Sequence, residues 1–288
     1  MRTIKDMLLA DKPSMLVGVH TALAAKIAEE AGFDGLWISS FEVHAAARLP
    51  DADILGTQDY VEIANKIVDR VQSPVLVDGN AGGGNAINTI RLVREFHKAG
   101  TSGICIEDNV FPKRCTFYDG MQDDIEKEST FCGKLDAALD ARPTDDFAII
   151  ARTEALTKGL GIEVALERCH AYAERGVDGI LIHHKGKDKE SVLEFAERWR
   201  ADHTTPLVCV PTTYGGVSYD ELSDAGFKII IIANAGVRAQ VRALQDCMAG
   251  LMRNKRLADV EDDIVPMEEI FRLVYVQELR ENEDRYVR

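Results

Sequence analysis

The chain alternates between short apolar runs and longer segments in which apolar residues recur with the spacing of a helix. Eight runs are rich in Val and Ile, at residues 15–19, 35–39, 74–78, 103–107, 147–152, 179–183, 206–210 and 228–233. Each run is continuous rather than alternating, which predicts strands buried on both faces, as in a parallel sheet covered by helices. Turns such as EEAGFDG and ERGVDG precede several runs, and their glycines suit a helix end before the next strand.

The eight successive strand–helix units predict a closed barrel. Eight units in about 250 residues is the size of an α/β fold of the (β/α)8 TIM-barrel type. The alternative is an open doubly wound sheet, but no GxGxxG motif follows the first run. We therefore predict one barrel domain over residues 1–288, with a C-terminal helical extension at about residues 262–288. Ile270, Phe271 and Val274 form an apolar stripe on this extension, which requires a partner surface.

Composition and charge exclude several classes of protein. A net charge of −14 argues against a nucleic-acid binder, which needs a basic face to neutralise phosphates. The apolar runs are far shorter than the roughly 20 residues of a membrane span. The N-terminal MRTIKDMLLADKPS lacks the features of a signal peptide, and the six cysteines show no CxxC pairs. We expect a reduced cytoplasmic protein that binds neither nucleic acid nor membrane.

Every predicted strand is followed by polar residues. They are His20, Ser39, Ser40, Asp78, Asn80, Glu107, Asp108, Arg152, Glu154, His183, Thr212 and Asn234. In a barrel of this type the active site lies at the C-terminal ends of the strands, and polar groups are costly to bury there without use or pairing. The segment EDNVFPKRCTFYDG follows the fourth strand, so it is predicted to lie over this site.

Three of these residues, Asp78, Asn80 and Glu107, offer only oxygen ligands from neighbouring strands. That set favours a hard cation, and Mg²⁺ fits because it keeps several waters and takes few protein ligands. The alternative is that Asp78 pairs with Arg152 and that no metal binds. Arg152 could also bind a carboxylate or phosphoryl oxygen through a two-pronged contact.

The glycine-rich run GNAGGGNA at residues 79–86 has two interpretations. It can aim backbone N–H groups at an oxyanion ahead of a helix, which makes Asn85 a candidate substrate-binding residue. It can equally be a flexible turn that ends in an Asn cap.

Several segments together resemble the phosphoenolpyruvate mutase/isocitrate lyase superfamily over nearly the whole chain. They include GFDGLWISS, PVLVDGNAGGGNAIN, IEDNVFPKRC and FAIIARTEAL, and ARTEAL, VCVPTTY and EIFRL resemble the branch of the mutases and phosphonopyruvate hydrolases. The resemblance implies a Mg²⁺-dependent barrel whose last barrel helix is swapped between subunits, giving a homo-oligomer that is a dimer of dimers. It also implies a small anionic 2-oxo acid or enolpyruvyl substrate, in which a C–P or C–C bond is made or broken.

The resemblance also implies roles for individual residues. Asp78 matches the direct Mg²⁺ ligand, Glu107 an acid that acts through water, and Asp51 an acid that supports the metal shell. The backbone amides that hold the substrate carboxylate match Ser39, Ser40 and Phe41. The groups that contact the transferred oxyanion match Arg152 and His183, and the lysine of the mobile lid matches Lys113.

The chain departs from the family pattern at three places. The metal loop D-x-D-T-G-Y-G-N reads DGNAGGGN here, so Asn80 replaces an acid. The lid signature E-D-K-x5-N-S reads EDNVFPKRCT, so Asn109 replaces the lysine and Cys115 with Thr116 replaces Asn-Ser. The Ser-Gly of the substrate loop is Ser39-Ser40. One carboxylate fewer at the cation suggests a weaker metal site or a more anionic substrate.

Cys115 decides between the candidate reactions. In the lyase branch the sequence K-(K/R)-C-G-H carries a cysteine that exchanges a proton with the enolate, and here KRC is followed by Thr-Phe. Lys113 and Arg114 are expected to lower the thiol pKa and make it a catalytic acid; alternatively, the thiol only packs under the lid. Our leading hypothesis is a mutase-like isomerase that moves a phosphoryl group or an analogue such as arsenate from the enol oxygen to C3 of pyruvate. The alternatives are a lyase or hydrolase that cleaves a C–C or C–P bond, and an inactive barrel kept for binding or assembly.

Overall fold

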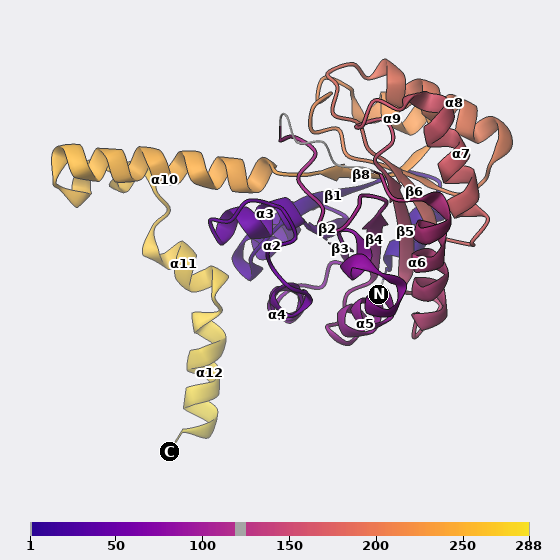
Figure 1. Ribbon diagram of the computed structural model, residues 1–288. Coiled ribbons are helices and arrows are strands. Elements are labelled where there is room, and N and C mark those ends of the chain that lie inside the picture. The colour runs from indigo at the N-terminus through magenta and orange to yellow at the C-terminus, as the bar shows by residue number, and fades with distance from the viewer. Residues whose placement is uncertain (1, 119–124, 288) are drawn as a thin grey trace. The chain divides into compact units, whose positions relative to one another are not determined.

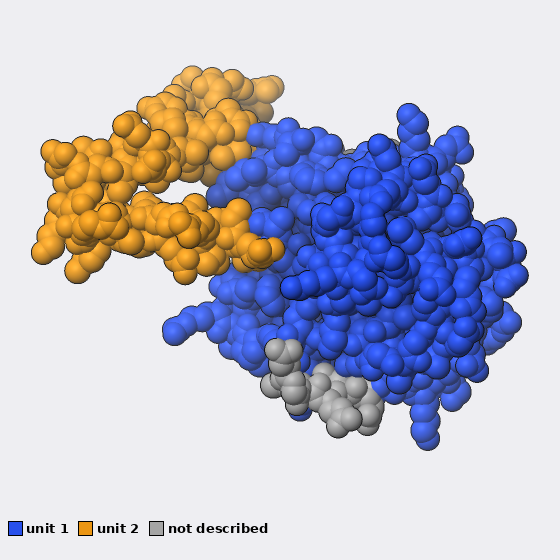
Figure 2. All heavy atoms as spheres, turned by 90° about the horizontal axis from the view of Figure 1, so that it is seen from above, with its two compact units in different colours: residues 1–236 blue, residues 237–288 orange. Residues whose placement is uncertain are grey.

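The computed structural model describes residues 2–118 and 125–287 of the chain (Figure 1). They form two compact units, residues 1–236 and residues 237–288, which Figure 2 shows in separate colours.

The first unit is built on a closed barrel of eight parallel strands in sequence order, as predicted. The pairing of β1 with β8 closes it, with Ser14 opposite Ile229 and Val17 opposite Ile232. The strands are β1 (Ser14–Val19), β2 (Gly35–Ile38), β3 (Val75–Asp78), β4 (Gly103–Glu107), β5 (Ala148–Thr153), β6 (Gly179–Ile182), β7 (Leu207–Cys209) and β8 (Phe227–Ile232). Each lies within or beside one of the apolar runs of the sequence.

One helix of the first unit precedes β1, and the others connect successive strands. They are α1 (Ile4–Leu8), α2 (Ala22–Glu30), α3 (Ser40–Ala46), α4 (Thr57–Val68), α5 (Ala86–Lys98), α6 (Glu128–Ala141), α7 (Gly161–Ala173), α8 (Glu190–Asp202) and α9 (Tyr219–Asp224), with a short 3₁₀ turn at Gly82–Gly84. Side-chain caps begin several of them: the Thr21 hydroxyl accepts the N–H of Ala24 at α2, and the Ser39 hydroxyl accepts that of Glu42 at α3.

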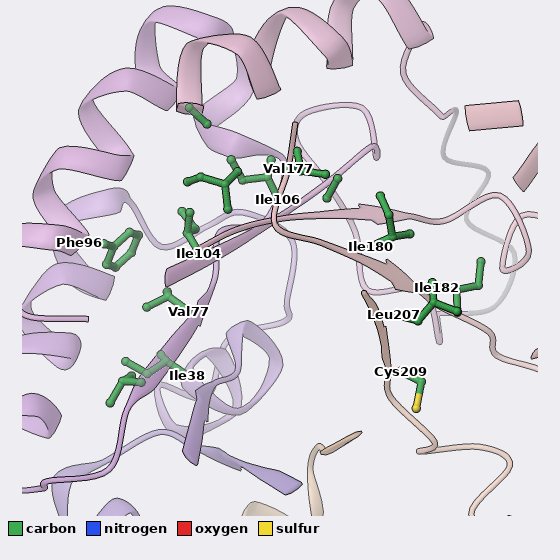
Figure 3. Packing of buried hydrophobic residues seen from close by; sticks show 14 of the residues in the cluster. Ile38, Val77, Phe96, Ile104, Ile106, Val177, Ile180, Ile182, Leu207 and Cys209 are labelled. Atoms are coloured by element: carbon green, nitrogen blue, oxygen red, sulfur yellow. The ribbon is translucent and has the colours of Figure 1, made fainter. Parts of the chain in front are cut away.

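The apolar core has two layers because successive strand residues point to opposite faces. Leu16, Trp37, Leu76 and other inward residues fill the barrel, together with three side chains of α1. Val17, Ile38 and the remaining strand residues pack against the helices, and Figure 3 shows part of this outer layer. Both faces of each strand are therefore buried, which explains the continuous apolar runs in the sequence.

The second unit contains most of α10 (Ala235–Asn254), then α11 (Met267–Leu273) and α12 (Val276–Tyr286), with 3₁₀ turns at Leu257–Asp259 and Glu261–Asp263. Many of its large apolar side chains are exposed: Val241, Leu244, Met248, Met252, Leu257, Ile264, Val265, Met267, Phe271, Val274 and Leu279. The expected division into one domain and an extension from about residue 262 stays a prediction. Within the described residues, no helix combines the length and apolar character needed to cross a membrane.

Candidate active site

A cavity lies among residues at and beyond the C-terminal ends of the barrel strands. It brings together ten of the twelve residues to which the sequence assigned a catalytic, substrate-binding or metal-binding role: Ser39, Ser40, Phe41, Asp51, Asp78, Glu107, Lys113, Cys115, Arg152 and His183. Asn80 lies in the wall of a neighbouring cavity that shares Asp78. Asn85 lines neither cavity; its side chain caps α5 by accepting the N–H of Asn88.

Oxygen atoms gather on the β3–β4 side of the cavity. The Asp78 carboxylate accepts the Ser40 hydroxyl at 3.1 Å and the N–H of Asn80 at 3.1 Å. Asn109 donates to Glu107 Oε1 at 2.9 Å. Glu107 Oε2 and Asn80 Oδ1 are buried and accept no hydrogen bond from the described residues, although Arg152 Nη2 forms an ion pair with Glu107 Oε2 at 3.3 Å. Because a buried oxygen without a donor is costly, Asn80 Oδ1 fits a site completed by a cation or its waters.

The described side chains alone do not complete the coordination of a divalent metal. No three His, Cys, Asp or Glu side chains among the described residues converge closely enough to hold a metal by themselves. Two carboxylates and one amide oxygen nevertheless fit Mg²⁺, which retains water and binds through one or two carboxylates plus substrate oxygens. The alternative Asp78–Arg152 pair is long, at 3.9 Å between Oδ2 and Nη1. The metal-binding roles stay a prediction.

Lys113 lines the cavity and contacts Ser40, the first residue of α3, and Asp51. Its ammonium donates to the Ser40 hydroxyl at 2.8 Å and to Asp51 Oδ2 at 3.0 Å, and the side chain is buried. Burial alone would lower the pKa of Lys113, but the carboxylates of Glu107, Asp51 and Asp78 raise that pKa well above its ordinary value. Lys113 is therefore a fixed positive charge at neutral pH.

Arg152 and His183 converge on Glu154, which is fully buried. Arg152 donates from Nε to Glu154 Oε1 at 2.5 Å, and His183 Nδ1 lies 2.9 Å from the same oxygen. Burial acts to raise the pKa of Glu154, but Arg152 and His183 hold that pKa well below its usual range. His183 Nδ1 also lies 2.9 Å from Arg152 Nη2, so this ring nitrogen faces both the Glu154 carboxylate and the Arg152 guanidinium, and Nε2 is the other ring nitrogen.

Sequence reasoning noted Glu154 as a polar strand end but gave it no role. The available signal was its spacing from Arg152, because residues i and i+2 of a strand share one face. A second buried acid, Glu42, went unnoticed. It accepts the N–H of Asn234 at 2.9 Å beyond β8, and its other oxygen lies 3.1 Å from His20 Nδ1. A Cβ at Gly18 would lie 1.9 Å from Glu42 Oε1, so only glycine fits there.

The prediction that Lys113 and Arg114 lower the pKa of Cys115 is wrong. The thiol is buried, and this burial raises its pKa to about 11, although the N–H of Phe117 and the charge of Lys113 act to lower it. Cys115 is therefore a neutral thiol at physiological pH, and a weaker acid than a free cysteine.

The glycine-rich run favours the turn-and-cap interpretation. The N–H groups of Gly79, Asn80, Gly82 and Gly84 all donate within the protein, to Cys105, Asp78, Gly79 and Ala81 respectively. Asn85 then begins α5 as its cap. These donors are occupied rather than aimed at a ligand.

Comparison with known proteins gives a consistent set of relatives. The family model described as phosphoenolpyruvate phosphomutase matches residues 4–252. A phosphonopyruvate hydrolase from Variovorax sp. is 36% identical over 275 residues, which cover 94% of this chain and 93% of the relative. Lyases are also among the relatives, including a 2-methylisocitrate lyase from Aeropyrum pernix at 32% identity over 92% of this chain and 85% of the relative.

Solved structures agree with the sequence relatives. The crystal structure of phosphoenolpyruvate phosphomutase from Streptomyces platensis subsp. rosaceus superposes with a TM-score of 0.96 at 39% identity, covering 99% of this chain and 98% of that one. A phosphonopyruvate hydrolase in complex with oxalate and Mg²⁺ superposes with a TM-score of 0.93 at 34% identity over the same shares.

Proposed function

The chain belongs to the phosphoenolpyruvate phosphomutase family, and on that basis we propose that it is a Mg²⁺-dependent mutase-like isomerase. The reaction moves an oxyanion group, phosphoryl or an analogue such as arsenate, from the enol oxygen to C3 of pyruvate. The bond from the group to oxygen breaks and its bond to carbon forms, so no water is consumed. The observation that carries the proposal is that one cavity holds the oxygen donors Asp78 and Glu107 together with the cations Lys113 and Arg152, and that Arg152 Nη2 lies 3.3 Å from Glu107 Oε2.

Asp78 would hold the metal directly and Glu107 through water, with the Asn80 amide oxygen nearby. The buried Asn80 oxygen, which accepts no hydrogen bond from the described residues, supports this assignment, as does the relative with oxalate and Mg²⁺ bound. When bound, Mg²⁺ would offset negative charge on the carboxylate and enolate oxygens of the substrate.

The chain's own residues would bind the two ends of the substrate. Ser39, Ser40 and Phe41 line the cavity where α3 begins, and the first N–H groups of a helix have no partner within it. The Ser39 N–H donates to the Val19 carbonyl at 3.4 Å, so the amides of Ser40 and Phe41 would receive the carboxylate. Arg152 would hold the migrating oxyanion, with Glu154 fixing the direction of its guanidinium. Preorganised donors of this kind stabilise charge without reorganising during the reaction.

Charge in the cavity supports a polyanionic substrate. Three acids, Asp51, Asp78 and Glu107, face three cations, Lys113, Arg114 and Arg152, so the charges of these six side chains cancel. A divalent cation would bring that sum to +2, which suits a substrate that carries two or more negative charges. With the acid that the family carries in place of Asn80, this charge sum would be +1.

A lyase or hydrolase that cleaves a C–C or C–P bond is the second candidate, favoured by the KRC sequence and by the hydrolase and lyase relatives. In a lyase Cys115 would protonate the released enolate at carbon, and the buried thiol, with its pKa raised to about 11, is a weaker acid for that step than a free cysteine.

We also propose that the protein is a homo-oligomer, a dimer of dimers in which the last barrel helix is swapped between subunits. The exposed apolar side chains of α10 and α11 support a subunit contact, because isolated chains rarely expose so many.

Product identification tests the proposed reaction. The protein is incubated with Mg²⁺ and phosphonopyruvate, and in parallel with the arsenic analogue, and the products are followed by NMR. Phosphoenolpyruvate or its arsenic counterpart supports a mutase. Free phosphate or arsenate with pyruvate overturns it in favour of a hydrolase.

A further inference from the structure

Lys134, on α6, is a buried lysine that has no place in the proposed reaction. Its side chain is 0% exposed, and its ammonium donates to the carbonyl of Ala81 at 3.0 Å and lies 2.5 Å from Glu126 Oε2. Removing an ammonium from water costs several kcal/mol unless good partners replace the water. Lys134 therefore depends on two partners that lie in different loops.

The first partner belongs to the glycine-rich loop that follows β3. Three consecutive carbonyl groups of this loop accept side-chain donors: Ala81 from Lys134, Gly82 from Thr89 Oγ1 at 2.7 Å and Gly83 from Asn88 Nδ2 at 2.9 Å. Thr89 and Asn88 lie on α5, which continues directly from the loop. Lys134 is thus the donor that fastens the loop to another helix, and Ala81 is adjacent to Asn80 and three residues from Asp78.

The second partner lies at the end of the segment between β4 and α6. The N–H of Glu126 donates to the carbonyl of Asp108 at 2.8 Å, and the carbonyl of Glu126 accepts Arg168 Nη2 at 2.9 Å. Ile125 forms an antiparallel bridge with Asn109, whose amide donates to Glu107 Oε1. Glu126 is therefore joined by short contacts to the strand end that carries Glu107.

We propose that Lys134 is a positioning residue that fixes the spacing of the two oxygen-donor groups, Asp78 with Asn80 on one side and Glu107 on the other. Its ammonium contacts both the loop that follows β3, at Ala81, and Glu126, which is hydrogen-bonded to Asp108 at the end of β4. The inference rests on the proposed metal site. Residues that orient ligands from outside the ligand set change metal affinity by about 10- to 100-fold when they are replaced.

Lys134→Met tests the inference, because it keeps the length and burial of the side chain and removes both polar contacts. We expect calorimetry with Mg²⁺ alone to give a dissociation constant raised about tenfold, and kcat at saturating Mg²⁺ to change less than threefold. Lys66→Met is the matched control, since Lys66 is an exposed lysine paired with Glu62 on α4. Glu126→Gln is the milder variant if Lys134→Met fails to fold, and we expect a smaller weakening in the same direction.

Amide hydrogen exchange of the metal-free protein separates this inference from the metal assignment. The peptide that covers residues 79–84 should exchange faster in Lys134→Met than in wild type, and the peptide of α4 should not change. If this peptide exchanges faster in Lys134→Met but the wild-type protein binds no Mg²⁺, the metal site is overturned, and the expected effect on Mg²⁺ affinity with it. Unchanged exchange together with an unchanged Mg²⁺ affinity would overturn the role of Lys134 alone, and a lower melting temperature with unchanged affinity would show a structural ion pair only.

Discussion

Replacing Glu154 with glutamine should damage both the stability and the ligand affinity of the protein. The carboxylate accepts four donors: Arg152 Nε at 2.5 Å, Thr157 Oγ1 at 2.6 Å, His183 Nδ1 at 2.9 Å and Thr116 Oγ1 at 3.1 Å. Glutamine offers one acceptor oxygen. Its NH₂ group is a donor, so it cannot accept the hydrogen bonds of the remaining donors. Breaking a buried ion pair costs about 3–5 kcal/mol, so we expect the free energy of unfolding at pH 7 to fall by about that amount.

The pH dependence of this loss follows from the lowered pKa of Glu154. A carboxylate whose folded pKa lies below its unfolded value contributes stability above the unfolded pKa and loses it as the pH falls through the folded pKa. The difference between wild type and Glu154→Gln should therefore be full at pH 7 and shrink below about pH 4. Urea unfolding at several pH values measures it.

The affinity of the Glu154→Gln protein for oxalate tests the effect on ligand binding. Oxalate binding in the presence of Mg²⁺, followed by calorimetry, should weaken about 10²-fold, because loss of a buried charged hydrogen-bond partner costs about 3 kcal/mol or more. Glu163→Gln is the matched control, since Glu163 pairs with Arg198 at the surface. A Glu154→Gln protein with wild-type stability and oxalate affinity would refute the reasoning.

Three further outcomes are expected. Asp78→Ala should abolish Mg²⁺-dependent activity, whereas Asn80→Asp should be tolerated and bind Mg²⁺ more tightly; a rate unaffected by EDTA would contradict the metal assignment. Cys115→Ser should reduce kcat/KM less than about tenfold and Lys113→Ala by about 10²-fold or more, because a mutase needs the charge but no proton at C3; the reverse order, with product identified, would favour the lyase. Sedimentation should give a dimer or tetramer, and Phe271→Asp should weaken it; a stable, active wild-type monomer would contradict the helix swap.

The barrel could be predicted from the sequence because its strands are buried on both faces, so that each strand appears as an uninterrupted apolar run. The residues at the strand ends were predictable for a related reason: a closed parallel barrel brings them to one rim whatever the loops do. That is why Asp78, Glu107, Arg152 and His183, which are far apart in the chain, line one cavity.

Properties that depend on burial and on long-range partners were not predictable in this way. Lys113 and Arg114 adjoin Cys115 in sequence, but burial outweighs both charges and raises the thiol pKa. Asn85 fitted a substrate-binding motif equally well as a helix cap, and only the occupied N–H groups of the loop distinguish the two. Lys134 sits in an ordinary amphipathic helix, and nothing in its neighbourhood along the chain indicates that it reaches Ala81, 53 positions away.

The reaction of phosphonopyruvate with Mg²⁺ in ¹⁸O-labelled water tests the central claim most directly. A mutase transfers the phosphoryl group between carbon and oxygen of the pyruvyl unit, so water is not a reactant. Phosphorus NMR and mass spectrometry should therefore show phosphoenolpyruvate with no solvent ¹⁸O in its non-bridging phosphoryl oxygens, and Asp78→Ala should give no phosphoenolpyruvate. Pyruvate with phosphate that carries one solvent ¹⁸O would contradict the mutase.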